Sequence, residues 1–189
     1  MTDTPLSRFP VPRLEDLPAD IREKIEEVQD KAGFVPNVFL ALAHRPSEWR
    51  AFFAYYEALM ERDSGLTKAE REMIVVATSA ANQCQYCVIA HGAILRVRAK
   101  NPLIADQVAA NWRKADITPR QRAMLGFAMK VSERAQEVDE ADFAALAAEG
   151  LDAEDAWDIA AISAFFGMSN RMANVMTTRP NDEFYSLGR

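Results

Sequence analysis

The chain has 189 residues, 49% of them hydrophobic, and a formal net charge of −6 at pH 7. This length and composition suit one well-packed domain and argue against disorder, while the negative charge argues against a nucleic-acid partner, which needs a basic surface. No apolar run reaches membrane-spanning length, and the polar, proline-rich start lacks a hydrophobic signal core. We therefore expect no membrane partner and a cytoplasmic location.

The sequence predicts helices almost throughout, because it is rich in Ala, Leu, Glu and Arg, has seven glycines and lacks Asn-Gly or Asp-Gly hairpin signals. The first helix should end at Gly33, and a capping box of Thr67 and Glu70 should open the fourth. In chain order we place helices over 18–33, 36–46, 46–65, 66–82, 84–99, 102–113, 118–136, 139–149 and 153–176. These helices form a single all-α domain, 19–189, preceded by an N-terminal arm, 1–18.

Two segments resemble each other within the chain. "LTKAEREMIVVA" (66–77) and "ITPRQRAMLGFA" (117–128) align without gaps, which indicates two similar helical hairpins. Chance similarity between two amphipathic helices is the alternative. Glu72 corresponds to Ala123 in this alignment, and nothing in the second segment corresponds to the two cysteines. If the repeat is real, the chemistry belongs to the first copy.

Both cysteines and one of the two histidines lie within residues 84–91. Cys84, Cys87 and His91 are three and four residues apart, so a helix would place their side chains on one face. Cys84 lies near the expected helix start, where free N–H groups and the helix dipole lower a thiol pKa. His91 lies one turn beyond Cys87 and could take its proton. This geometry nominates Cys87 as the attacking thiol and Cys84 as its resolving partner.

A base beside a thiol usually needs an orienting group, and Glu72 is the best upstream candidate. It lies at the edge of the apolar run from Met73 to Val76 on the preceding helix. A carboxylate in such a place either faces solvent or is held inward for a reason. Taken alone, the solvent-facing interpretation is favoured, because charges on helices are usually solvated.

Together these residues form a recognisable pattern. Glu72, Cys84, Cys87 and His91 reproduce the E-x11-C-x2-C-x3-H signature of the AhpD-like alkylhydroperoxidases, in the carboxymuconolactone decarboxylase superfamily. The chain resembles in particular the uncharacterised peroxidase-related branch, and "GFVPNVFLALAHRP" and "FFGMSNRMANVMTTRP" are also similar to that branch. The resemblance covers most of the chain from about residue 10. A CxxC pair alone is weak evidence, whereas the complete four-residue pattern is specific.

The resemblance implies an all-helical, cofactor-free enzyme that forms homo-oligomers, often trimers or hexamers, and reduces small hydroperoxides. By the same resemblance Cys87 attacks the peroxide, Cys84 closes the disulfide, Glu72 and His91 relay the proton, and an external dithiol is the reductant. One position departs from the best-known pattern, which has a histidine between the cysteines where this chain has Tyr86. A phenol is a poor base near neutral pH, so the relay would be shorter. Lactone-decarboxylating members lack the paired cysteines, which disfavours that activity.

Three other interpretations of the cluster stay open. Cys84 and Cys87 could be two small buried hydrophobes, or they could form a redox-sensing or disulfide-exchange module without peroxidase turnover. The two sulfurs, with His91 and Glu72, could also bind a metal such as zinc. The remaining histidine, His44, lies near a predicted helix end and is most simply a cap.

Two further groups are not assigned to the site. The aromatic-rich stretch 47–60 and the methionines at 168, 172 and 176 are expected to form core or a subunit interface. Asn170, Arg171 and Asn174 lie among these methionines, and we expect them to cap or to bind across subunits and assign them no catalytic role.

Overall fold

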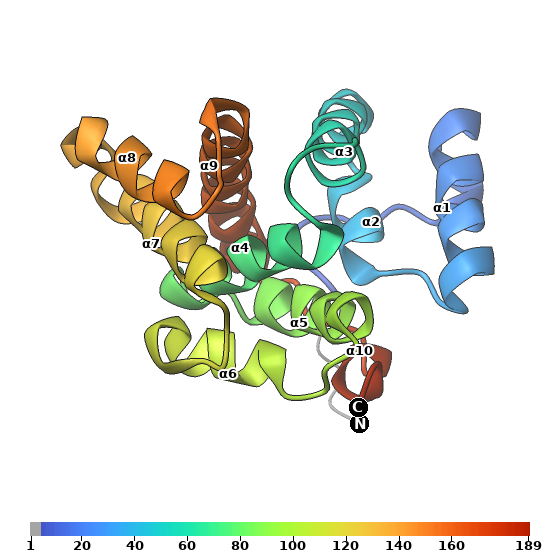
Figure 1. Ribbon diagram of the computed structural model, residues 1–189. Coiled ribbons are helices and arrows are strands. Elements are labelled where there is room, and N and C mark those ends of the chain that lie inside the picture. The colour runs from blue at the N-terminus through green and yellow to red at the C-terminus, as the bar shows by residue number, and fades with distance from the viewer. Residues whose placement is uncertain (1–4) are drawn as a thin grey trace.

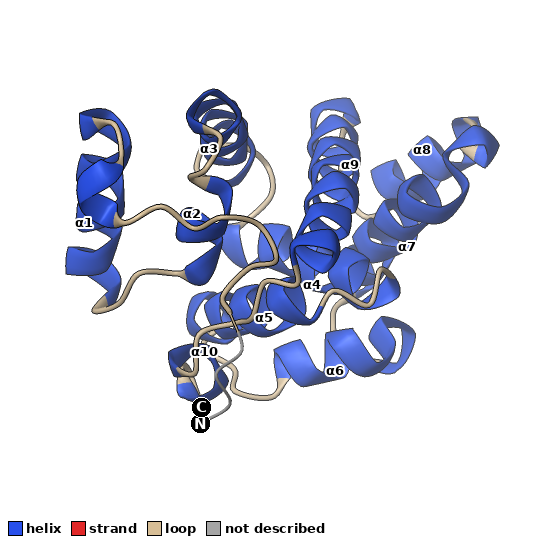
Figure 2. Cartoon of the chain, turned by 180° about the vertical axis from the view of Figure 1, so that it is seen from behind, coloured by secondary structure: helices blue, strands red, loops and turns tan. Residues whose placement is uncertain are grey.

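The computed structural model describes residues 5–189, and within that range all regular structure is helical (Figure 1; Figure 2). The elements are η1 (Leu14–Asp16), α1 (Ala19–Ala32), α2 (Asn37–Leu42), α3 (Pro46–Met60), α4 (Lys68–Ala81), α5 (Gln85–Ala99), α6 (Ile104–Asn111), η2 (Trp112–Lys114), α7 (Pro119–Arg134), η3 (Ala135–Glu137), α8 (Glu140–Ala148), α9 (Ala153–Met176) and α10 (Glu183–Ser186). The all-α fold class predicted from the sequence is confirmed. No helix within residues 5–189 has both the length and the apolar composition needed to cross a membrane.

Local signals set the ends of these helices. Gly33 follows α1 with φ +82°, a left-handed conformation that glycine adopts without strain, and its N–H bonds Gln29 O at 2.7 Å. The Thr67–Glu70 capping box opens α4 as predicted. Helix α3 ends at Met60, five residues before the predicted stop, and α10 was not predicted at all. Four residues are too few to form a helix alone, so α10 depends on docking.

The resemblance between 66–77 and 117–128 extends to the structure of α4 and α7. Thr118 opens α7 with the same capping box that Thr67 forms in α4. Arg71 donates to Leu59 O at 3.1 Å and Arg122 donates to Ala115 O at 3.2 Å, so each arginine bonds a carbonyl that precedes its own helix. These paired roles support the alignment of the two segments.

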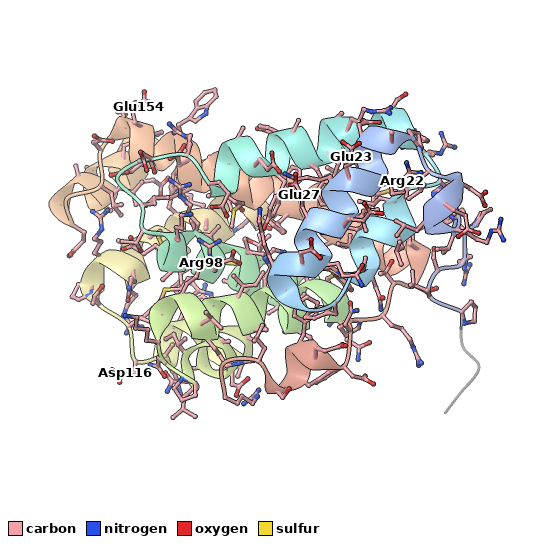
Figure 3. The ribbon with its side chains drawn as sticks, turned by 90° about the vertical axis from the view of Figure 1, so that its right-hand side faces the viewer. Arg22, Glu23, Glu27, Arg98, Asp116 and Glu154 are labelled. Atoms are coloured by element: carbon pink, nitrogen blue, oxygen red, sulfur yellow. The ribbon has the colours of Figure 1, made fainter. Side chains whose placement is uncertain are left out.

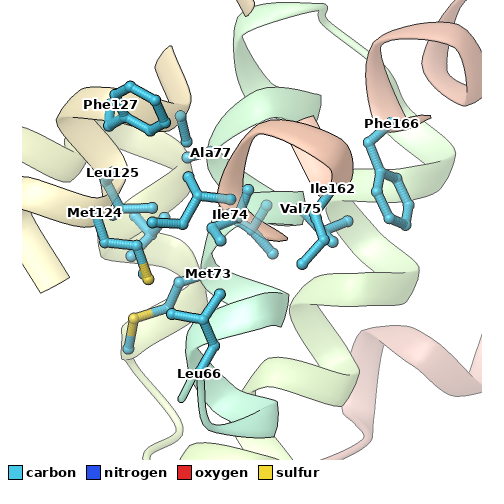
Figure 4. Close-up of a cluster of buried hydrophobic side chains, with 14 of the residues drawn as sticks. Leu66, Met73, Ile74, Val75, Ala77, Met124, Leu125, Phe127, Ile162 and Phe166 are labelled. Atoms are coloured by element: carbon cyan, nitrogen blue, oxygen red, sulfur yellow. The ribbon is translucent and has the colours of Figure 1, made fainter. Parts of the chain in front are cut away.

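Helix α4 is the centre of the main core, with α5, α6, α7 and α9 packed around it. Ile74, Val75 and Val76 are fully buried, so this β-branched run lies in a buried helix, within the helix predicted over 66–82. Figure 4 shows this cluster, in which Met124 of α7 and Ile162 of α9 meet the apolar face of α4. Because the burial of each large apolar side chain stabilises the folded state by about 1.5–3 kcal/mol, this helix contributes strongly to the stability of the fold.

A separate apolar cluster joins α1, α2 and α3 to one another. These three helices lie to one side of α4 and α5 (Figure 1). Ile21 and Ile25 of α1 pack towards Trp49 and Phe53 of α3. The opposite face of α1 carries exposed charges, including Glu23 and Glu27 (the labelled pair in Figure 3). This amphipathic pattern fixes which side of α1 faces the body of the protein.

The predicted arm, 1–18, lies partly outside the described residues. Over 5–18 the chain runs against the domain, with Ser7 and Leu17 buried and the Arg8 N–H bonded to Met176 O at 2.9 Å. The boundary at residue 18 stays a prediction.

A tight turn between α4 and α5 positions the cysteines. Gln83 has φ +51°, a left-handed conformation that is uncommon for a residue with a side chain. The following Cys84 N–H bonds Ser79 O at 2.9 Å, so the turn closes on the last turn of α4. Helix α5 therefore folds back along α4 and brings their facing side chains together.

Candidate active site

Both cysteines lie at the start of α5. Cys84 is the residue before its first turn, and Cys87 follows within that turn. The two are free thiols, and their exposed fractions are 0% for Cys84 and 3% for Cys87. Cys87 lines an apolar cavity, which is described below, whereas Cys84 is not part of its lining. The predicted arrangement on one face of a helix start is observed.

The two thiols differ in acidity. Hydrogen bonding from Cys87 to the Cys84 sulfur is the main cause that lowers the pKa of Cys84, to about 7, against the opposing effect of burial. The same interaction, together with burial, raises the pKa of Cys87 well above its usual value. The pair therefore loses its first proton near neutral pH and shares the second, with the charge resting on Cys84.

Two residues of α9 contact this pair and were not expected from the sequence. Asn170 is fully buried and its side chain lowers the pKa of both thiols, and Ser169 acts in the same direction on Cys87. The Asn170 amide is fixed in turn, because it donates to Ser79 Oγ at 2.9 Å and accepts from Asn82 Nδ2 at 3.1 Å. The sequence analysis gave Asn170 no catalytic role, whereas the structure places its amide beside the cysteine pair, because α9 packs against the α4–α5 turn.

Glu72 is held inward. Its side chain is 1% exposed, and Oε2 lies 2.8 Å from Nδ1 of His91. A carboxylate oxygen accepts, so Nδ1 donates and the other imidazole nitrogen, Nε2, is left without a proton in the neutral ring. The solvent-facing interpretation of Glu72 is therefore wrong. The cause is the α4–α5 turn, which places the two side chains face to face.

His91 and Cys87 share a cavity of about 110 Å³ between α2, α3, α5, α9 and α10. Its lining is mostly apolar, and its aromatic members are Phe39, Phe52, Phe53, Tyr56, Tyr86, Phe166 and Phe184. His91 is held edge-on against Phe166, with ring centroids 4.8 Å apart. A small apolar molecule in this cavity would meet the Cys87 sulfur and the imidazole together.

Two tyrosines face the cavity as neutral groups. Tyr86 accepts a hydrogen bond from Val38 N at 3.2 Å, so it fixes α2 over the cavity. Burial raises the pKa of Tyr86 and, more strongly, that of Tyr56. Neither phenol can act as a base near neutral pH, in line with the shorter relay expected from the sequence. Tyr56, on α3, belongs to the aromatic-rich stretch 47–60, which the sequence analysis assigned to core or a subunit interface and not to the site.

The metal interpretation finds no set of ligands in the described part of the chain. Across residues 5–189, no three His, Cys, Asp or Glu side chains are grouped so that they could hold an ion. His44 follows α2, and its Nδ1 lies 3.2 Å from Ala41 O, which agrees with the predicted capping role.

Comparison with known proteins places this site in a family. The family model of the carboxymuconolactone decarboxylase family matches residues 46–110, which include all four predicted site residues. An uncharacterised peroxidase-related protein with an alkylhydroperoxidase AhpD core, from Ralstonia eutropha JMP134, is 71% identical, with a TM-score of 0.98 over 98% of both chains. The chain belongs to the AhpD-like proteins of this family. An uncharacterised peroxidase-related protein from Silicibacter sp. TM1040 is 38% identical to this AhpD-like chain, with a TM-score of 0.94 over 100% of it and 99% of the other.

The AhpD-like fold also occurs in a more distant solved structure. The debrominase Bmp8, in complex with 2,3,4-tribromopyrrole, is 21% identical, with a TM-score of 0.78 over 98% of this chain and 96% of that one. Among curated proteins, none matches the chain.

Proposed function

We propose that this AhpD-like protein is a thiol-dependent hydroperoxide reductase. The observation that carries the proposal is the cavity that joins Cys87 to His91, with Glu72 bonded behind the imidazole at 2.8 Å. Thiol peroxidases need a reactive sulfur, a proton path and a second thiol, and this site offers all three within one helix turn and its neighbour.

The reaction begins when the shared proton moves from Cys87 to Cys84, which places the thiolate on the sulfur that faces the cavity. This thiolate attacks one oxygen of the hydroperoxide ROOH, the O–O bond breaks, and Cys87 becomes a sulfenic acid. The leaving oxygen takes a proton from Nε2 of His91, which has taken up from solvent the proton that the cysteine pair released on ionising, and it departs as ROH. Glu72 balances the charge on the imidazole while the proton passes.

The cycle closes through the second thiol. Cys84 attacks the sulfenic sulfur of Cys87, which releases water and forms the disulfide. An external dithiol then reduces this disulfide and is itself oxidised to a disulfide. No cofactor takes part in these steps.

The first experiment measures the intact mass of reduced Cys84→Ser protein after brief exposure to one equivalent of hydroperoxide with a sulfenic-acid trap. We expect one trapped adduct, mapping to Cys87, because Cys87 lines the cavity and has lost its resolving partner. Cys87→Ser should show no adduct and no peroxide reduction. A Cys87→Ser variant that still reduces peroxide would contradict the proposal.

A turnover assay on the parent protein, which keeps both cysteines, distinguishes a peroxidase from a redox sensor. A peroxidase turns over repeatedly when an external dithiol is supplied, whereas a sensor forms the disulfide once and then stops. Peroxide consumption beyond one equivalent per protein, with dithiothreitol as reductant, supports the enzyme. Consumption that ends at one equivalent supports the sensor.

Reductive debromination is a second candidate, favoured by the aromatic lining of the cavity over Cys87. In that reaction two thiols give two electrons to a carbon–bromine bond, and the products are the C–H compound, bromide and the Cys84–Cys87 disulfide. Bromide release from 2,3,4-tribromopyrrole, compared with peroxide consumption under the same reductant, distinguishes the two activities.

A further inference from the structure

Arg98 lies on the same face of α5 as His91. It lies seven residues after His91, so the helix places both side chains on the same side (Arg98 is labelled in Figure 3). Its side chain is about one quarter exposed and reaches from the surface towards α4. The sequence analysis did not include this residue in the site.

The free oxygen of Glu72 lies close to this arginine. While Oε2 bonds His91, Oε1 is buried and has no hydrogen-bond partner among the described residues. The nearest cationic atom given by the structure is Arg98 Nε, at 4.0 Å. That separation is too long for a hydrogen bond, but two opposite charges 4.0 Å apart in a partly buried place still attract each other strongly.

Arg98 is itself held by a second carboxylate. Its Nη2 donates to Oε1 of Glu61, the residue that follows α3, at 2.8 Å. Lys68 bonds the other oxygen of Glu61. The guanidinium can serve two carboxylates at once because its donors point in fixed, separate directions. Starting beside His91, the negative Glu72, the positive Arg98 and the negative Glu61 thus follow one another towards the surface.

We propose that Arg98 is a positioning residue, which holds the buried Glu72 carboxylate turned so that Oε2 accepts from His91 Nδ1 and His91 presents Nε2 to the cavity. The inference rests on the proposed thiol chemistry, although Arg98 touches neither sulfur nor substrate. The groups that face Glu72 are His91 and Arg98 on α5, with Tyr56 and Glu61 from α3 and its end. Tyr56 stays neutral and Glu61 is negative, so the favourable permanent charge comes from Arg98.

The test compares Arg98→Met and Arg98→Lys with the parent. Two readouts are used on reduced protein: the pH dependence of thiol alkylation by iodoacetamide, and the ¹⁵N spectrum of the His91 imidazole. Neither readout requires peroxide turnover, so the inference can fail while the peroxidase proposal stands, and the reverse. Arg50→Met is the matched control, because Arg50 forms an exposed two-bond pair with Asp20 away from the cavity.

In Arg98→Met the buried Glu72 carboxylate loses the cation beside Oε1, and with it the contact that keeps Oε2 turned towards His91. We expect alkylation at pH 7 to fall roughly tenfold, the equivalent of about 1.4 kcal/mol, and its onset to move to higher pH. The imidazole spectrum should shift away from a single Nδ1–H form. Arg98→Lys should restore most of the rate, because it keeps the charge, and Arg50→Met should match the parent.

An unchanged pH profile and imidazole spectrum in Arg98→Met would overturn the inference, as would an Arg98→Lys variant as impaired as Arg98→Met. A purely structural role would lower the melting temperature of Arg98→Met without moving the pH profile. If Arg98→Met does not fold, Arg98→Gln gives the same test, since it retains a polar contact for Glu61 but carries no charge.

Discussion

At the scale of single residues, acidity and access are divided between the two cysteines. The sulfur with the lowered pKa, Cys84, is sealed from the cavity, and the sulfur that faces the cavity, Cys87, holds its proton more tightly. Transfer of one proton between neighbouring sulfurs changes which of them is charged without changing the net charge of the pair. The pair therefore reacts as one acid, and a property of either sulfur alone does not describe it.

This coupling gives a pH prediction for Cys87→Ala. Hydrogen bonding from Cys87 is the largest cause of the lowered pKa of Cys84, which is about 7 in the parent. The parent thiolate should therefore form as pH rises through about 7, and in Cys87→Ala the same transition should move to higher pH. Thiolate absorbance at 240 nm against pH measures the shift. A Cys87→Ala transition that stays near pH 7 would show that the backbone and Asn170 suffice.

The residues predicted for the site share one property, which is closeness in sequence. Helical spacing was enough to bring Cys84, Cys87 and His91 together at one helix start, whereas Glu72, on the preceding helix, was assigned to the site only by the resemblance to the family signature. Asn170 and Tyr56 reach the same place from α9 and α3. Spacing carries no information about such contacts, because they depend on how separate helices pack.

At the scale of helices, α2 and α9 form a wall between two cavities. Leu42 at the end of α2 and Met172 of α9 line the cavity over Cys87, and they also line a more open apolar groove between α3 and α9. Met172 is 41% exposed, so only part of its side chain is fixed by packing. We therefore expect the size of the flexible Met172 side chain to limit the size of the molecules that enter the cavity over Cys87.

Met172→Ala should join the groove to the cavity and widen the range of substrates. We expect the ratio of activity with cumene hydroperoxide to activity with hydrogen peroxide to rise at least about tenfold, since even one methylene group in an apolar pocket changes discrimination by about 10–200-fold. Met168→Ala is the matched control, because Met168 lines the groove but not the cavity. Equal ratios in the two variants would contradict a role for Met172 in selection.

Helix ends were predictable where a cap or a glycine marks them. Thr67, Thr118 and Gly33 each stand at the predicted boundary and act as predicted. Helix α3 stops early because Glu61 turns to bind Lys68 and Arg98, contacts made with α4 and α5. Helix α10 carries no internal signal at all, since its four residues are helical only where they dock.

At the scale of the whole molecule, the last residues complete the cavity from outside the helical core. Arg96 of α5 donates to the carbonyls of Phe184 and Leu187 at 2.8 and 2.9 Å and so fixes α10 beside α5 (Figure 1). Asn181 bonds Asn37 N at 2.8 Å and Val35 O at 2.9 Å, which ties the same segment to the start of α2. Two walls of the cavity thus depend on one terminal segment.

Deletion of residues 181–189 should loosen both walls. Loss of the buried Phe184 alone removes about 2–3 kcal/mol of apolar burial, and the bonds to Asn37 and Val35 are lost with it. We expect a lower melting temperature and faster alkylation of Cys87 by iodoacetamide. Arg189→Gln is the control, because it removes only the exposed bonds of Arg189 to Asp106 and to Tyr185 O and leaves the rest of the segment in place. An alkylation rate equal to that of the control would show that α2 closes the cavity unaided.

In the proposed reaction cycle, burial of Cys84 also governs how the Cys84–Cys87 disulfide would be reopened. An incoming reductant can reach the sulfur of Cys87, which lines the cavity, so the mixed disulfide forms there and Cys84 is the group expelled. The expelled sulfur meets the backbone N–H of Cys87 and the amide of Asn170, both already aimed at it. Because a better-stabilised thiolate leaves faster, the position that shields Cys84 from peroxide also makes it a good leaving group, and the oxidised protein returns readily to its dithiol form.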